Sequence, residues 1–102
     1  MTFRWHDLLF EGAFRHPGEL LPRHGVYIIW CDRGIGWAVL DVGQSDDVRA
    51  RVLSHERKDC WRQHCAGAIL YAVHYTPGMD EDGRRALEGQ IRAMDRPTCG
   101  EV

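Results

Sequence analysis

The run Gly25–Cys31 reads GVYIIWC, and the run Trp37–Gly43 reads WAVLDVG. Both runs are rich in β-branched and aromatic residues, which favour strands. The segment between them, residues 32–36, reads DRGIG and has strong turn chemistry. The two runs therefore predict a β-hairpin, and a turn centred on this segment would place Tyr27 opposite Asp41 on one face of the sheet.

A helix is predicted directly after the second strand. Ser45 and the two aspartates that follow it can cap free amide groups, and acidic residues favour the positive end of a helix dipole. We expect this helix over residues 47–57. Arg51 and His55 are one turn apart, so they should lie side by side at the margin of its buried stripe.

The remaining elements complete an α+β domain. Residues 1–24 are expected to form a covering helix and a loop, Ala68–Thr76 a third strand, and Asp80–Met94 a final helix. The prediction is a small three-stranded, mainly antiparallel sheet flanked by helices. Three tryptophans are assigned to core packing rather than to base stacking: Trp30, Trp37 and Trp61.

Composition limits the classes of function. At 102 residues and 44% hydrophobic content, the chain is predicted to form one domain over residues 1–102. The formal net charge of -2 and a pI near 6.3 argue against a broad basic surface, so any phosphate recognition should be local. No apolar run of about 18 residues and no signal-like start is present, which predicts a cytoplasmic protein without a membrane span.

The four cysteines are interpreted as reduced thiols, because no secretory signal accompanies them. A structural zinc site is the alternative, since Cys60, His64 and Cys65 lie close together in the sequence, with His55 upstream. The chain lacks the paired C-x-x-C motifs that usually supply tetrahedral zinc ligands, so this alternative is disfavoured.

Two motifs in the strand-forming runs resemble those of the GIY-YIG nuclease domain family. Gly25-Val26-Tyr27 matches the first tripeptide, and residues 41–45, DVGQS, match the second motif and the polar pair after it. Asp41 stands where the family has its second tyrosine. The similarity extends over about residues 21–97, although the asparagine often found after the last helix has no counterpart in residues 97–100.

The resemblance implies a role for each of four side chains. Tyr27 would take the proton from the attacking water, directly or through another water. Arg51 would hold a non-bridging phosphate oxygen. Glu88, on the last predicted helix, would bind one divalent cation, Mg²⁺ or Mn²⁺, because hard cations prefer carboxylate oxygen. His55 would orient Tyr27 or the phosphate.

Asp41 is assigned to the same catalytic group. Our hypothesis is that its carboxylate accepts the proton or supplies a second metal ligand. Substrate contacts are expected from four residues of the second motif and the helix after it: Gly43, Gln44, Ser45 and Arg49.

Structural roles are the alternative for these side chains. Tyr27 could be a core aromatic residue of a strand. Glu88 is one helical turn from both Arg84 and Arg92, which is also the pattern of a solvent-facing row of ion pairs. The order and spacing of the motifs favour the functional interpretation.

The function implied by the resemblance is a divalent-metal-dependent endonuclease that hydrolyses phosphodiester bonds in DNA, leaving a 5′-phosphate and a 3′-hydroxyl. Branched or damaged DNA is a candidate substrate, as in DNA repair. Two other classes stay open: a catalytically impaired nucleic-acid-binding module on the same fold, and a protein-interaction module. No helix-turn-helix or zinc finger is evident to predict a sequence preference.

Overall fold

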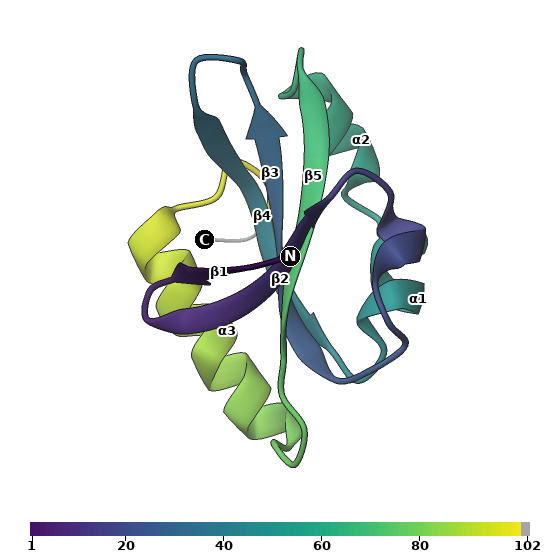
Figure 1. Cartoon of the computed structure of the whole chain (residues 1–102), viewed down its shortest axis with the longest axis vertical. Coiled ribbons are helices and arrows are strands. Elements are labelled where there is room, and N and C mark those ends of the chain that lie inside the picture. The colour runs from purple at the N-terminus through teal and green to yellow at the C-terminus, as the bar shows by residue number, and fades with distance from the viewer. Residues whose placement is uncertain (101–102) are drawn as a thin grey trace.

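The computed structural model describes residues 1–100 of the 102-residue chain. It contains a five-stranded antiparallel sheet in the order β1-β2-β5-β3-β4, with helices on both faces (Figure 1). The strands are β1 (Thr2–Trp5), β2 (Leu8–Phe14), β3 (Gly25–Asp32), β4 (Trp37–Ser45) and β5 (Ala68–Tyr75). The helical elements are the 3-10 turn η1 (Pro17–Glu19) and the helices α1 (Val48–Leu53), α2 (Lys58–Gln63) and α3 (Glu81–Asp95). The α+β class is confirmed, but the prediction of three strands was wrong.

The two additional strands lie in the N-terminal segment, where a helix had been expected. β1 and β2 form a hairpin, and β2 pairs with β5. Burial along β2 follows a period of two, because Phe10 and Gly12 are buried while Leu9 and Glu11 are exposed. Such alternation is typical of a strand with one face on the core.

The predicted β3–β4 hairpin is confirmed, but its register differs from the prediction. Tyr27 pairs with Gly43, and Asp41 pairs with Ile29. One residue of the difference comes from the turn, which pairs Asp32 with Trp37, and the second comes from a bulge between Ile29 and Trp30. Such a bulge places two residues opposite one. Tyr27 and Asp41 are therefore diagonal rather than direct neighbours.

Each face of the sheet has its own hydrophobic core. Val48 and Val52 of α1 and Trp61 of α2 pack in the core of one face. Phe10 of β2 and Ile91 of α3 pack in the core of the other face, where the β1–β2 hairpin also lies (Figure 1). β4 is an edge strand, so side chains from both layers can meet beside it.

The core assignment of the tryptophans is confirmed for Trp30 and Trp61, which are 2% and 1% exposed. It was wrong for Trp37, which is 53% exposed at the start of β4. Trp37 contacts the ring of Trp30 at a centroid distance of 5.3 Å.

The helix expected over residues 47–57 is shorter than predicted. α1 ends at Leu53, and Asp47 caps its start by accepting a 3.0 Å hydrogen bond from the Ala50 amide. The final helix is confirmed as α3, with Asp80 as its cap. Within residues 1–100, no helix is long and apolar enough to cross a membrane.

The cysteines form two disulfides, Cys31–Cys65 and Cys60–Cys99, so the prediction of reduced thiols was wrong. The partners are 34 and 39 residues apart in the sequence and meet only through the tertiary fold. Stable disulfides are typical of oxidising surroundings. The cytoplasmic location therefore stays a prediction.

Candidate functional site

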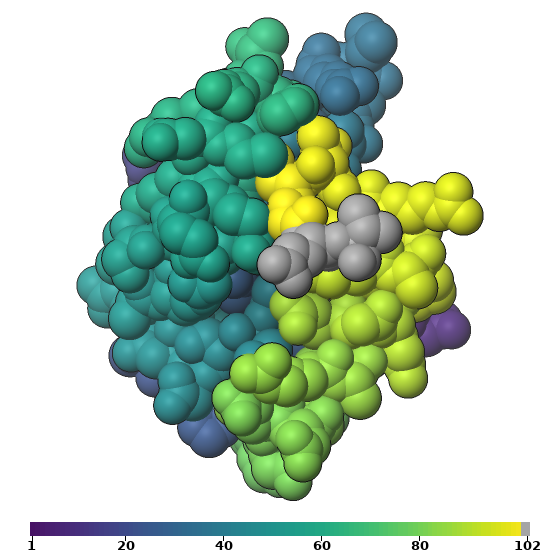
Figure 2. All heavy atoms as spheres, turned by 180° about the vertical axis from the view of Figure 1, so that it is seen from behind, coloured from purple at the N-terminus to yellow at the C-terminus, as the bar shows by residue number. Residues whose placement is uncertain are grey.

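A polar cleft of about 560 Å³ lies beside β4, where the two helical layers meet. Figure 2 shows the surface hollowed between the teal α1–α2 region and the green helix α3. The lining residues are Tyr27, Gln44, Arg51, Arg57, Arg85, Glu88 and Arg92. Tyr27, Arg51 and Glu88, which the motifs single out on three separate elements, thus border one cavity.

Gly43 determines where the Tyr27 ring can lie. The two residues pair across β3 and β4, and a Cβ atom on residue 43 would lie 2.1 Å from the Tyr27 hydroxyl oxygen and 2.2 Å from Cζ. Only glycine leaves room for this ring position. Gly43 therefore provides the space that the Tyr27 ring occupies, which is a different role from the expected substrate contact.

Replacing this glycine tests the packing directly. We expect Gly43→Ala to lower the free energy of unfolding by about 1–3 kcal/mol, as overpacking of a core does. The loss should shrink in a Tyr27→Ala background, since the clash disappears with the ring. Chemical denaturation measures both. Gly89→Ala is the matched control, because a Cβ there meets nothing within 4 Å on α3; equal losses at both sites would contradict this packing.

His55 holds the Tyr27 hydroxyl in a defined orientation. His55 Nε2 lies 2.9 Å from Tyr27 Oη, and both groups are buried. The Arg57 backbone N–H donates to His55 Nδ1 at 3.0 Å, so Nδ1 must be an acceptor. A neutral imidazole then has its proton on Nε2, which donates to Tyr27 Oη. The Tyr27 O–H is left free to donate into the cleft.

Burial and the arginines set the ionisation of this pair. Burial raises the pKa of Tyr27 well above its ordinary value, and the nearby Arg51 only partly offsets the effect. Burial also lowers the pKa of His55 to about 4, with further lowering by Arg51 and Arg57. Both groups are therefore neutral at pH 7, in agreement with the hydrogen-bond pattern.

The lowered pKa of His55 predicts a pH-dependent stability. The unfolded chain binds more protons than the folded chain between the ordinary His55 pKa of 6.5 and the folded value of about 4. The contribution of neutral His55 to stability is thus lost as the pH falls through this window. We expect His55→Gln to flatten the fall in unfolding free energy between these values. Glu88, whose pKa is raised by burial, acts in the opposite direction but is common to both proteins.

Denaturation at a series of pH values measures the slope. The control is His16→Gln, which removes an exposed imidazole at the start of η1. The same slope in wild type and His55→Gln would show that His55 does not remain neutral in the fold.

Arg51 reaches the cleft while paired with Glu56. Its guanidinium donates two hydrogen bonds to the Glu56 carboxylate, at 2.5 and 2.9 Å. This pair lowers the pKa of Glu56 to about 2. The two side chains are 36% and 59% exposed, so another anion can reach the Arg51 guanidinium from solvent. A phosphate group can therefore displace Glu56 from Arg51.

Glu88 is the acidic residue among those that line the cleft. Its carboxylate lies 3.7 Å from Arg92 Nε on the same helix, and its side chain is 23% exposed. Burial raises the pKa of Glu88, and the arginines Arg92, Arg57 and Arg85 oppose the shift. A carboxylate that is partly buried yet faces a polar cavity is chemically suited to a hard divalent cation, which would favour its charged form.

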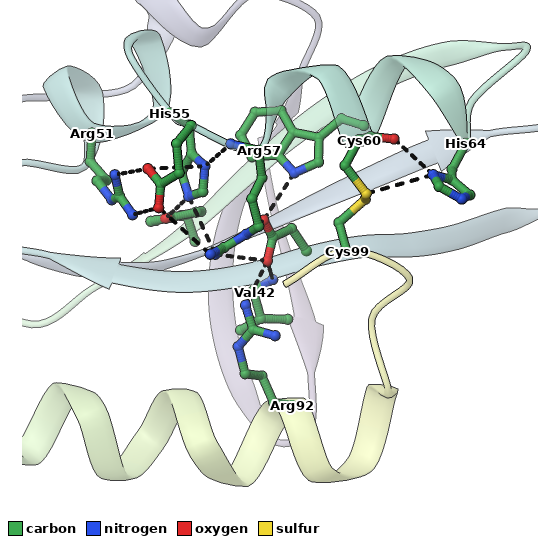
Figure 3. Close-up of polar contacts among 12 residues, drawn as sticks. Val42, Arg51, His55, Arg57, Cys60, His64, Arg92 and Cys99 are labelled. Atoms are coloured by element: carbon green, nitrogen blue, oxygen red, sulfur yellow. Dashed lines mark hydrogen bonds and ion pairs between the residues drawn. A yellow bond between two sulfur atoms is a disulfide. The ribbon is translucent and has the colours of Figure 1, made fainter. Parts of the chain in front are cut away.

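Asp41 is enclosed by hydrogen-bond donors from both helical layers. Figure 3 labels two of these donors, Arg57 and Arg92. Arg92 donates to Oδ1 at 2.6 Å, Arg57 Nε donates to Oδ2 at 2.7 Å, and Trp61 Nε1 donates to Oδ2 at 2.9 Å. The Val42 amide donates to Oδ1 at 2.9 Å, and the carboxylate is fully buried. These contacts favour a structural role for Asp41 over the proton-accepting or metal-binding role of the sequence hypothesis.

The remaining predicted substrate contacts occupy different places. Gln44 lines the cleft and accepts a 3.0 Å hydrogen bond from Arg84 Nε. Ser45 Oγ accepts from the Asp47 amide at 3.0 Å, which supports the start of α1. Arg49 is exposed on α1 and is not among the residues that line the cleft.

Sequence reasoning missed three arginines of the cleft: Arg57, Arg85 and Arg92. Arg85 and Arg92 stand three residues before and four residues after Glu88, which places all three on one face of α3. From that spacing, the sequence could have predicted that Arg85 and Arg92 lie beside Glu88. The solvent-facing ion-pair row considered for Arg84, Glu88 and Arg92 does not describe Arg84, which is buried.

A scan against protein-family models, a search of curated proteins and a search of solved structures each found no match for this chain. The likeness to GIY-YIG domains thus depends on the motifs, and the functional argument depends on the cleft.

Proposed function

We propose that this chain is a divalent-cation-dependent endonuclease that hydrolyses phosphodiester bonds in DNA. The observation that supports the proposal is the shared cleft of Tyr27, Arg51 and Glu88. Phosphodiester hydrolysis needs a group that accepts a proton from the attacking water, a positively charged side chain that stabilises charge on the phosphate, and a side chain that binds the metal ion. The three side chains supply these three kinds of group.

The arginines give the cleft its affinity for phosphate. Arg51 would exchange its exposed partner Glu56 for two phosphate oxygens, because a guanidinium binds either group through the same fork geometry. Arg57 and Arg92 stay paired with Asp41 and contribute positive charge at the wall. This arrangement provides local phosphate recognition in a chain of formal net charge -2.

Tyr27 would accept the proton of the attacking water, directly or through another water. In the resting protein it is a neutral phenol whose O–H can orient that water or a phosphate oxygen. Accepting a proton requires the phenolate. The His55 Nε2–H and the positive charges of Arg51 and Arg57 are placed to stabilise it.

Glu88 would hold Mg²⁺ or Mn²⁺ through a carboxylate oxygen, with waters and phosphate oxygens as the other ligands. When bound, the cation would supply Lewis-acid stabilisation of the charge on the phosphate and leaving group.

The position of the Tyr27 hydroxyl inside the cleft favours distorted DNA as the substrate. Tyr27 is only 1% exposed, so a phosphate must enter the cleft to reach its hydroxyl. Unpaired or branched strands can bend into such a recess more easily than a regular duplex, whose deformation costs free energy. We therefore include flap, junction and single-stranded DNA among the candidate substrates.

The test is a cleavage assay on single-stranded, duplex, flap and junction DNA, with Mg²⁺, Mn²⁺ or a chelator. We expect cutting only with a divalent cation. Glu88→Gln should require a cation concentration at least about tenfold higher, since even a supporting residue of a metal site has this effect. Glu11→Gln, an exposed change of the same charge on β2, is the control. Salt-dependent binding without cutting would instead assign a binding module, and no binding would favour a protein-interaction domain.

A further inference from the structure

A second cluster of metal-ligating side chains lies outside the cleft, at the end of α2. The ligand atoms of Cys60, His64 and Cys99 lie within 4.8 Å of one another. Cys60 and His64 are one helical turn apart, with Sγ and Nδ1 separated by 3.6 Å, and Cys99 arrives from the segment after α3 (Figure 3). Two sulfurs and an imidazole nitrogen thus converge from two parts of the chain.

We propose that, when the Cys60–Cys99 disulfide is reduced, these three side chains bind a thiophilic divalent cation such as Zn²⁺. Thiolate and imidazole are the ligands that zinc prefers, and three protein ligands leave a fourth tetrahedral position for water. The Glu88 cleft has only oxygen ligands and suits a hard cation. The two sites therefore differ in the metal that they select.

The disulfide and the metal exclude each other chemically. A dithiol reductant transfers two electrons and two protons, which breaks the Cys60–Cys99 S–S bond, forms two thiols and converts the reductant to its own disulfide. Zinc then displaces both thiol protons as the two Zn–S bonds form. Sulfurs that are bonded to each other have no thiolate to offer.

The fold keeps the three ligands together after reduction. The Thr98 and Cys99 amides donate to the carbonyls of Val39 and Leu40 on β4, at 3.2 and 2.7 Å. These bonds hold Cys99 in place independently of its sulfur. The 2.9 Å contact between His64 Nδ1 and the Cys60 carbonyl would be given up, since Nδ1 must be deprotonated to bind the metal.

His64 gives the metal access to the site. Cys99 is buried and Cys60 is half-buried, but His64 is exposed. The side chains of Gln63 and His64 also line a cavity of about 450 Å³ at this end of the molecule. A cation can therefore reach His64 directly from solvent.

The experiment compares the full chain before and after reduction with a dithiol that is then removed under argon. Zn²⁺ is titrated against a chromophoric chelator, and Co²⁺ serves as a spectroscopic probe of thiolate and tetrahedral coordination. The reduced protein should bind about one equivalent of Zn²⁺, and the disulfide form should bind none at this site. His64→Asn should weaken binding at least about tenfold, the lower limit seen even for supporting residues of metal sites.

Two controls decide which residues bind the metal. His16→Asn removes an exposed imidazole far from the cluster in the sequence and should leave the affinity unchanged. The double variant Cys31→Ser, Cys65→Ser removes the other thiol pair and should retain the Co²⁺ thiolate band. The proposal is overturned if the reduced wild type binds no Zn²⁺, if His64→Asn binds as tightly as His16→Asn, or if the double variant loses the band while remaining folded by circular dichroism.

Discussion

Tyr27→Phe is expected to lower the rate of cation-dependent DNA cleavage by about 10²–10⁴-fold, the usual contribution of a positioned proton-transfer group. The substitution removes only the hydroxyl, so the buried ring still packs between Gly43 and the core. The His55 Nε2–H loses its acceptor, and the cleft loses the O–H that orients water. A single-turnover cleavage rate at saturating protein isolates the chemical step from binding.

Tyr71→Phe is the matched control, because Tyr71 is a partly buried tyrosine on β5 that does not line the cleft. It should cleave at the wild-type rate. DNA affinity, measured by fluorescence anisotropy, should be similar for both variants, since Arg51 is retained. Equal cleavage rates for Tyr27→Phe and wild type would remove Tyr27 from the chemistry.

Asp41→Asn is expected to lower the free energy of unfolding by about 3–5 kcal/mol, the range for breaking a buried ion pair by removing one partner. The amide has no negative charge, so Arg57 and Arg92 lose their common counterion. One amide group also cannot accept all of the hydrogen bonds that the carboxylate accepts from these arginines and Trp61. Denaturant unfolding with the disulfides intact measures the loss.

Asp59→Asn makes the same chemical change at a site where the side chain is 91% exposed and pairs with Arg62. Its effect should stay within about 0.5 kcal/mol, as for most surface substitutions. If Asp41→Asn were equally mild but abolished cation binding, Asp41 would be a metal ligand, as the sequence hypothesis proposed. The assignment of a structural role to Asp41 would then be wrong.

The β3–β4 hairpin and α3 could be predicted because their patterns are local. Strand-forming runs enclose a turn in the first case, and a capping aspartate precedes a helical pattern in the second. β2 could not, because the apolar run Leu8–Phe10 is followed by Phe14, and Phe10 and Phe14 are four residues apart, which is also a helical spacing. Pairing with β5, a long-range contact, decides between the two.

The site could be predicted only in part. Tyr27, Arg51 and Glu88 stood out through their motifs, and the cleft brings them together. The role of Asp41 was not accessible, because its partners come from a loop, from α2 and from α3, and because a bulge moves it away from Tyr27. The disulfides were missed for the same reason, since no local pattern shows which cysteines meet.

The most direct test of the shared site is a crystal structure of the chain with Mn²⁺ and a short single-stranded DNA, with anomalous diffraction data to locate the metal. We expect the Mn²⁺ signal beside a Glu88 carboxylate oxygen, at about the 2.0–2.2 Å typical of small hard cations. A phosphate oxygen should lie within hydrogen-bond distance of Arg51 and of the Tyr27 hydroxyl. Mn²⁺ remote from Glu88, together with DNA bound on a face that does not include the cleft, would contradict the proposed site.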